Sequence, residues 1–563
     1  MLLKINRKYM ISLSAEQKSL EGIYCSPTEL YIVPQYQRPY SWTFDQCADL
    51  FRDIVSAYEN KESYFLGNII LARSKSYDMN GESFIVDGQQ RLITLWTIIK
   101  VLAELLPNVN TLKTALSVMP WSGDKHAPKI KSLIFENKDN EAILEVFNYS
   151  KDDIVHRYNV LTQKNTILKE EKCRSQIEAS LLYFYEQISN SSFGGDDSRL
   201  MEFSQFLMKR ITILPIVQTA DDESKATDKA LTIFETINNR GLDLEDADIF
   251  KARLYNSAYT DEQRNEFINL WVDFKAECMG LKITIDDIFR YYSHVIRGKE
   301  GITTNEKRLR DFFINEPFSP LNYSSYNDVL NDLSKILSSL KYIRQNAGIG
   351  DVSRPGPWIQ ILLEYTNQYP MYAIVVYLFN HDVEANESVG NFVKFLKALV
   401  RYCLITGSTS SVKFGIYPMI KTISFTNNME DFFQTDISIE DFNHLGRLKN
   451  CFALLVYLQE TGNSIPTKYS IDKIVNIRDE KLLGKDWHYK NINEICNSIG
   501  NLVVLDVPKR YNSIKEKPKQ YSGSKSNYVR SIFKNSSFGY NDWKNRNDLC
   551  RHLLVNFFKG NKQ

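Results

Sequence analysis

The sequence predicts an α+β protein that is predominantly helical and is built from more than one domain. The chain has 563 residues, which is more than one ordinary domain accommodates. Its composition is 43% hydrophobic and 24% charged, which is typical of a soluble globular protein and excludes a mostly disordered chain. Short β-prone runs occur near the two ends, and helical periodicity dominates between them. The predicted domains are residues 1–260, 261–460 and 461–563.

The first domain is expected to alternate short strands with helices. Buried strands are indicated by brief apolar runs, and helices by apolar residues that recur every three or four positions. The expected strands are residues 31–33, 67–72, 84–86 and 211–217, and the expected helices are residues 43–58, 90–105 and 226–237. Residues 125–210 are polar and mostly helical in pattern, and we interpret them as an insertion.

The middle and the end of the chain differ in pattern and in charge. Residues 261–460 are predicted to be a helical connector, where a partner or a second copy packs. Two short strands, 469–475 and 500–507, mark the last domain, and the Lys-rich stretch 508–526 is expected to be a solvated loop. Residues 466–563 hold 19 Lys and Arg against 9 Asp and Glu, whereas the first 465 residues hold 50 against 59. A basic tail on an acidic body is a footprint for nucleic acid.

Several common kinds of site have no support in the sequence. The eight cysteines include no C-x-x-C pair, which argues against a common zinc site and against a disulfide framework. There is no Walker A loop and no Gly-x-Ser-x-Gly elbow. The N-terminus lacks the apolar run of a signal peptide, and no apolar run approaches the roughly 18 residues that a membrane span needs. We therefore expect a cytoplasmic protein with no membrane partner.

The sharpest local feature is the segment Asp87-Gly88-Gln89-Gln90-Arg91, which follows a predicted buried strand and opens a helix. Free N–H groups at a helix N-terminus and a guanidinium together suit a phosphate. In this hypothesis Asp87 holds a metal ion or a water, and Gln89 or Gln90 orients that water, as amides do in phosphoryl transfer. The alternative is that Asp87 only caps the helix and Arg91 pairs with a surface acid.

Three further segments accompany this one in a recognisable order. They are residues 34–42 (PQYQRPYSW), 64–68 (YFLGN) and 234–244 (FETINNRGLDL). Together with the DGQQR segment they resemble the GmrSD-type family of type IV, modification-dependent restriction proteins. The resemblance implies a ParB/sulfiredoxin-like N-terminal domain that binds and hydrolyses a nucleoside triphosphate (NTP) with Mg²⁺ or another divalent ion. The implied nucleotide site comprises Arg38, Asp87, Gly88, Gln89, Gln90, Arg91, Asn238, Arg240 and Gly241.

The same family commonly carries a C-terminal HNH-type nuclease, and the tail resembles it in part. The matching positions are Asp472, Asn501, Asn512 and Lys525, but Lys473 stands where the pattern has histidine. That histidine is the general base, and a lysine with an ordinary pKa near 10.4 is protonated at neutral pH. His488 is the alternative base, if its loop folds back. The other reading, which we favour, is a degenerate ββα nuclease domain that binds DNA without cutting it.

Three hypotheses follow. In the first, the chain is an NTP-hydrolysing subunit that recognises foreign DNA, such as glucosylated or hydroxymethylated phage DNA. It would act with a nuclease-competent relative or as a homodimer. In the second, it is a stand-alone modification-dependent endonuclease with a non-standard base. In the third, it is a non-catalytic DNA-binding module whose DGQQR segment holds DNA phosphate.

Overall fold

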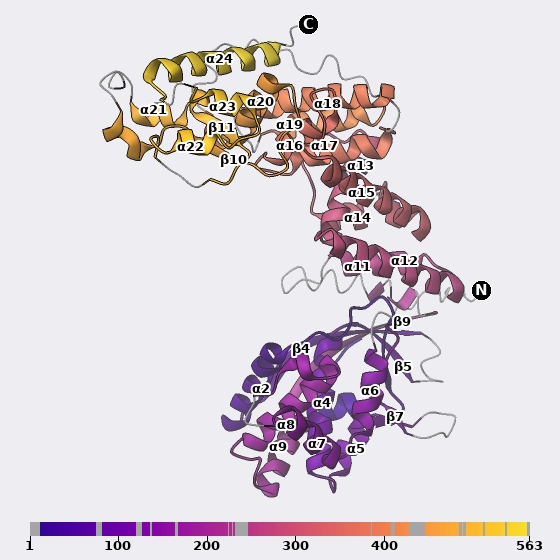
Figure 1. Ribbon diagram of the computed structural model, residues 1–563. Coiled ribbons are helices and arrows are strands. Elements are labelled where there is room, and N and C mark those ends of the chain that lie inside the picture. Colours follow the sequence, from indigo (N-terminus) through magenta and orange to yellow (C-terminus); the bar gives the residue numbers. More distant parts are fainter. Residues whose placement is uncertain are drawn as a thin grey trace, which may run out of the picture. The chain divides into compact units, whose positions relative to one another are not determined.

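The computed structural model divides the chain into two compact units, Met1–Asp273 and Phe274–Gln563 (Figure 1). Helices predominate in both, and the principal sheet lies in the first, so the prediction of a mixed, mainly helical chain is confirmed. The structure describes residues 12–559 except 75–80, 120–125, 135–137, 164–166, 223–224, 228, 231–245, 384–385, 407–410, 427–444, 484–486, 488–490, 510–512 and 535–536. The second half of the predicted helix 226–237 lies outside these described residues.

Unit 1 is built on a mixed seven-stranded sheet with the order β1-β9-β4-β5-β3-β8, in which β2 also pairs with β9. Strand β4 runs parallel to β9 and antiparallel to β5, and β3 runs parallel to both of its neighbours, β5 and β8. The strands are β1 (Ser12–Ala15), β2 (Lys18–Ser19), β3 (Leu30–Val33), β4 (Tyr64–Ser74), β5 (Glu82–Asp87), β8 (Ile130–Ser132) and β9 (Ile211–Ala220). The four strands expected from the sequence are β3, β4, β5 and β9.

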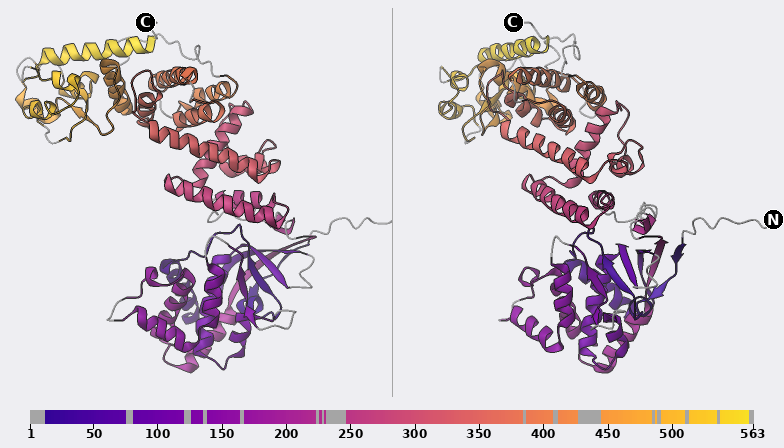
Figure 2. Two further views of the ribbon diagram at one scale, coloured as in Figure 1. Left: turned by 45° about the vertical axis from the view of Figure 1, so that its right-hand side comes forward. Right: turned by 90° about the vertical axis from the view of Figure 1, so that its right-hand side faces the viewer.

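One face of this sheet is covered by helices around α4 (Gln89–Leu105), which is buried on nearly every side because most of its residues are apolar. Figure 2 shows these helices gathered beside the fanned strands. The other helices of this layer are α1 (Leu20–Tyr24), α2 (Phe44–Glu59), α5 (Asn110–Leu116), α6 (Asp139–Asn148), α7 (Lys151–Leu161), α8 (Gln176–Asn190) and α9 (Asp197–Arg210). A small hairpin, β6 (Ser117–Val118) with β7 (Ala127–Pro128), lies between α5 and β8.

Residues 125–210, interpreted from the sequence as an insertion, are integrated into this core. Strand β8 extends the main sheet, and α8 packs against α4. Leu181 and Phe184 of α8 are fully buried in the same apolar cluster as Trp96 of α4. The polar residues of the segment face outward from several short helices, and that is why its pattern resembles an appended element.

The opposite face of the sheet has its own apolar cluster. Side chains alternate across a strand, so Ile69 of β4 packs toward α4 while Ile70 packs toward this second cluster. Helix α11 (Asp246–Asn256) contributes Ala252, and Tyr255 packs its ring against Tyr36 at 5.9 Å between centroids. The loop after β3 is therefore held from both sides of the sheet.

Unit 2 begins within α12 (Asp261–Gly280) and consists of a helical part followed by a small α+β part. The helices of the first part are α13 (Ile285–Lys299), α14 (Leu309–Asn315), α15 (Tyr326–Asn346), α16 (Pro355–Leu363), α17 (Tyr369–Asn380), α18 (Asn386–Ile405), α19 (Lys413–Ile423) and α20 (Lys449–Thr461). The elements of the second are β10 (Ser470–Lys473), α21 (Ile492–Asn497), β11 (Leu502–Leu505), α22 (Lys517–Tyr521), α23 (Asn527–Ser531) and α24 (Tyr540–Lys559).

The two parts of unit 2 are joined by α24, whose far end returns to the helical part. Phe557 stacks on Trp358 of α16 with 5.5 Å between ring centroids, and its carbonyl accepts a hydrogen bond from Arg401 of α18. Strands β10 and β11 lie within the two strands expected at residues 469–475 and 500–507, and they form an antiparallel pair. Among the described residues, no helix has the length and apolar character required to cross a membrane.

Candidate functional site

The DGQQR segment forms a tight strand-to-helix turn. Asp87 ends β5, Gly88 adopts a left-handed φ of 93°, and α4 begins at Gln89. A side chain at Gly88 would be strained at this φ, and its Cβ would lie 2.5 Å from Ile69 Cγ2. Because glycine has no side chain to cap the helix, the N–H groups of the first turn receive no side-chain cap. The turn thus presents the positive end of a 17-residue helix.

Asp87 and Arg91 lie together on this turn. Arg91 Nη2 is 3.2 Å from Asp87 Oδ2, and both side chains are about one quarter exposed. Arg91 Nη1 also donates to the Leu66 carbonyl at 3.0 Å, beside Gly67, where a Cβ would lie only 2.8 Å from Nη1. Burial raises the pKa of Asp87, and Arg91, the Gly88 N–H group and Arg38 each oppose that rise. The arginine therefore has a defined orientation and keeps one face toward solvent.

The two glutamines fasten the upstream PQYQRPYSW segment to the helix. Gln90 Nε2 donates to the Pro39 carbonyl at 3.0 Å, and Gln90 Oε1 accepts from Ser41 N at 2.9 Å. Gln89 Nε2 donates to the Arg38 carbonyl, while its Oε1 is buried and has no hydrogen-bond partner among the residues that the structure describes. Both ends of the Gln90 amide are thus engaged by backbone, whereas Gln89 retains one unused acceptor.

The sequence singled out Arg38 but not the residue beside it that locks the loop. Gln37 is buried, and its Nε2 donates to the Val86 carbonyl at 2.8 Å, one residue before Asp87. Arg38 itself is exposed and close enough to Asp87 to act on its charge. The sequence feature that could have identified Gln37 is its position next to Arg38 in the PQYQRPYSW segment. Asn238, Arg240 and Gly241 lie outside the described residues.

The tail places its predicted acid in a different setting. Asp472 on β10 is wholly buried. Its Oδ2 accepts hydrogen bonds from Lys517 Nζ at 3.0 Å and from Tyr521 OH at 2.9 Å, and its Oδ1 lies 3.0 Å from Lys509 Nζ. Lys517 is also fully buried and donates to the Lys473 carbonyl. Burial lowers the pKa of Lys517, an effect that Asp472 opposes.

Lys517 and Tyr521 correct one sequence expectation. Both belong to α22, within the Lys-rich stretch 508–526 that was expected to be a solvated loop. The stretch is in part a core element, because Asp472 supplies a buried partner for one of its lysines. The charge pattern alone does not reveal that partner, which lies 45 residues upstream.

The remaining tail residues have structural contacts. Asn501 is buried and bridges the backbone of Val475, accepting from its N–H at 2.8 Å and donating to its carbonyl at 2.9 Å. Lys473 Nζ donates to Asn497 Oδ1 at 3.3 Å. Lys525 is exposed, and its backbone N–H donates to Asp506. Asn512 and His488 lie outside the described residues.

The two acids differ in their fitness for the expected divalent ion. Magnesium is often held by one or two carboxylates together with water and phosphate oxygens, and the partly exposed Asp87 suits that mode. Asp472 does not, because its oxygens already face two lysines and a tyrosine. Within the part of the chain that the structure describes, no three His, Cys, Asp or Glu side chains converge on a metal position.

Comparison with known proteins adds one match. None of the curated proteins is similar to the chain beyond the level expected by chance. Residues 20–255 match the family described as the GmrSD restriction endonuclease, N-terminal domain. The matched segment runs from α1 to α11 and contains the whole strand-to-helix turn. The chain is thus similar to the N-terminal domain of this restriction endonuclease family over these residues, which make up less than half of its length.

Proposed function

We propose that the chain is an NTP-hydrolysing component of a modification-dependent DNA restriction system. The observation that carries the proposal is the turn at Gly88. It places the uncapped start of α4, the Arg91 guanidinium and the Asp87 carboxylate on one partly exposed rim, within the segment that matches the GmrSD N-terminal domain. A helix N-terminus and an arginine form a phosphate site in many unrelated proteins.

In this proposal the phosphates of an NTP lie against the first turn of α4. Arg91 contacts them from the helix, and the exposed Arg38 contacts them from the loop that the glutamines hold. Asp87 would hold the divalent ion, which when bound neutralises charge on the phosphates. Gln89 Oε1 is the unpartnered acceptor available to orient a water, and Gln90 is a positioning residue for the loop.

The tail has a separate part in the proposal. Its basic charge suits a DNA backbone, while its acid is committed to a buried cluster and its expected histidine is Lys473. We infer that the chain binds foreign or modified DNA and depends on a second, nuclease-competent subunit of the same family for cleavage.

The test is phosphate release from each of the four NTPs by the purified chain with Mg²⁺. Arg91→Ala should lower the rate at least about 100-fold, the usual cost of removing a positioned transition-state donor. The matched control is Arg52→Ala, because Arg52 is an exposed arginine of the same unit and, among the described residues, forms an ion pair with Asp49 alone.

Three results would count against the proposal. Equal rates of phosphate release in Arg91→Ala and Arg52→Ala would show that the turn at Gly88 takes no part in hydrolysis. Nucleotide binding without hydrolysis, with or without DNA, would favour the non-catalytic alternative. Cleavage of glucosylated or hydroxymethylated DNA by the isolated chain would contradict the need for a second subunit.

A further inference from the structure

The helical part of unit 2 contains a cavity that is separate from both the turn at Gly88 and the buried cluster around Asp472. Its volume is about 420 Å³, within the range of roughly 300–1,000 Å³ that is usual for small-molecule sites. It lies among the turn between α12 and α13, the helix α15, and the connection from α16 to α17. All of these residues belong to unit 2, so the cavity is distinct from the turn at Gly88.

The floor of the cavity is apolar. It is formed by Ile283, Leu340, Ile343, Leu362 and Met371, of which the last four are buried. Tyr291 adds an aromatic wall, and its ring is held edge-on against Tyr372 at 5.0 Å between centroids. A flat, weakly polar group can therefore bury its faces here.

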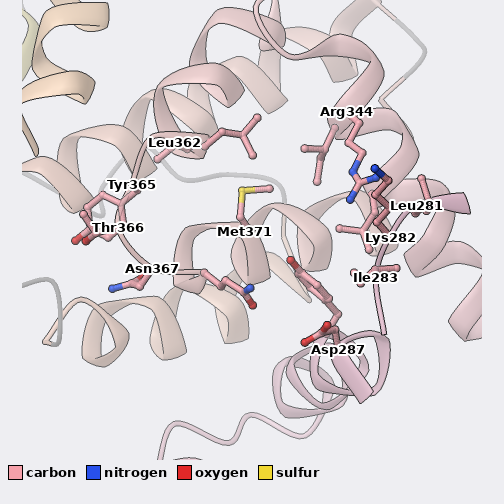
Figure 3. Close-up of a pocket in the computed structure, with 15 residues that line it drawn as sticks. Leu281, Lys282, Ile283, Asp287, Arg344, Leu362, Tyr365, Thr366, Asn367 and Met371 are labelled. Atoms are coloured by element: carbon pink, nitrogen blue, oxygen red, sulfur yellow. The ribbon is translucent and has the colours of Figure 1, made fainter. Parts of the chain in front are cut away.

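Two cations stand at one side of the cavity without an acidic partner. Figure 3 shows Arg344 and Lys282 together on one side, Thr366 and Asn367 on the other, and Met371 between them. Among the described residues neither cation forms a salt bridge, whereas Lys341, one turn earlier on α15, pairs with Glu277 at 2.8 Å. Lys282 also has a left-handed φ of 50°, which side chains rarely adopt.

The remaining polar groups suit the edges of a ligand. Gln368 Oε1 accepts from Tyr372 OH at 3.2 Å, and this leaves its amide N–H groups as donors. Asp287 Oδ2 is used by the Thr284 cap, and this leaves its second oxygen as an acceptor. An aliphatic acid would satisfy the two cations but would leave these donors and acceptors unpaired, which is unfavourable in a partly dry site.

We propose that this cavity binds one nucleotide unit. Its phosphate lies between Lys282 and Arg344, its base lies on the apolar floor beside Tyr291, and Gln368 and Asp287 contact polar edges of the base or sugar. The unit is either a free nucleoside monophosphate or a nucleotide turned out of a DNA strand, since both present the same chemistry. This inference does not require NTP hydrolysis by unit 1.

The test is equilibrium binding to the full chain in EDTA, which disfavours metal-dependent triphosphate binding elsewhere. The probes are AMP, dCMP, ribose 5-phosphate, which lacks a base, and a 12-nucleotide single strand of DNA. Arg344→Glu should weaken binding of the preferred probe at least tenfold. Leu363→Trp, at a partly exposed lining residue, should block the cavity without altering the core. Lys341→Glu makes the same charge change outside the cavity and is the control.

The pattern of results identifies the source or overturns the proposal. Binding of AMP or dCMP that Arg344→Glu weakens supports a free nucleotide, and the same loss seen only with the strand supports DNA. Equal affinity for ribose 5-phosphate and AMP would show that the cavity does not bind the base. Absence of binding by every probe, or equal binding by all three variants, would overturn it. Circular dichroism spectra that match the wild type confirm that the variants are folded.

Discussion

Asp87 is the last residue of a short strand and Asp472 the last but one, and both were candidates for chemistry, yet the structure gives them opposite surroundings. Asp87 is followed by a left-handed glycine and a helix start, has one arginine partner at 3.2 Å, and is about one quarter exposed. Asp472 is fully buried among two lysines and a tyrosine. An acid at a strand end is thus a candidate for ligand binding only where its own fold leaves it unsaturated.

The cause of the difference lies in what packs over each strand end. Beyond Asp87 the chain turns at once into α4, whose first turn has no side-chain cap, and Gln89 and Gln90 hold the neighbouring loop by hydrogen bonds to its backbone carbonyls. Over Asp472 lies α22, which brings Lys517 and Tyr521 into contact with the carboxylate. A buried ion pair is costly to break, because one partner is then left charged without compensation.

The largest effect is expected from Asp472→Ala, which leaves Lys517 buried and unpaired. The variant should lower the free energy of unfolding of unit 2 by about 3–5 kcal/mol. The measurement is urea unfolding followed by tryptophan fluorescence, because Trp487 and Trp543 belong to the same apolar cluster as Tyr521, and Trp96 belongs to the core of unit 1. Asp87→Ala, the matched change in the partly exposed setting, should cost less than about 1 kcal/mol. Equal losses of unfolding free energy in the two variants would show that the two acids contribute equally to stability.

A smaller effect is expected from Gln90→Ala, which tests whether the amide positions the loop or acts in the reaction. Loss of the contacts to Pro39 and Ser41 frees the backbone that carries Arg38. The KM for the NTP should rise about tenfold, equivalent to roughly 1.4 kcal/mol, while kcat changes less. Steady-state phosphate release measures both. A fall in kcat at constant KM would instead assign Gln90 to the chemical step.

A still smaller effect on stability is expected from Asp87→Asn. Burial raises the pKa of Asp87, so the folded state holds the proton more tightly than the unfolded state. The wild type therefore loses stability as the pH rises through that raised pKa, and the asparagine variant does not. At pH 7 the variant should be at least as stable as the wild type, with the difference vanishing as the pH falls below the ordinary pKa of an aspartate.

Unfolding curves at several pH values check this prediction, and phosphate release should be lost in the same variant. A variant that is less stable than the wild type at pH 7 would show that the pair with Arg91 outweighs the cost of burying the charge. If the variant still hydrolysed NTP, Asp87 would not be the residue that holds the divalent ion.

Local features of the sequence predicted the turn at Gly88, and distant contacts determined everything that was missed. The apolar strand, the acid at its end, the glycine and the first turn of the helix are contiguous in the sequence, so the geometry of the turn follows from neighbouring residues. The partner of Asp472 is 45 residues away, and the partners of Gln90 are 49 and 51 residues upstream. Lys517 looks solvated in sequence because a buried lysine is rare, and only its partner makes it tolerable.

The smallest effect, none, is expected from restoring the missing imidazole by Lys473→His. A general base needs a metal-bound substrate within reach, and the neighbouring Asp472 is occupied by Lys517, Lys509 and Tyr521. The measurement is nicking of plasmid and of modified phage DNA with Mg²⁺ or Mn²⁺, and Lys473→Gln serves as the control. Cleavage by the histidine variant alone would mean that one substitution separates this tail from an active nuclease. The burial of Asp472 would then be compatible with catalysis, and the contrast between the two acids would be one of degree.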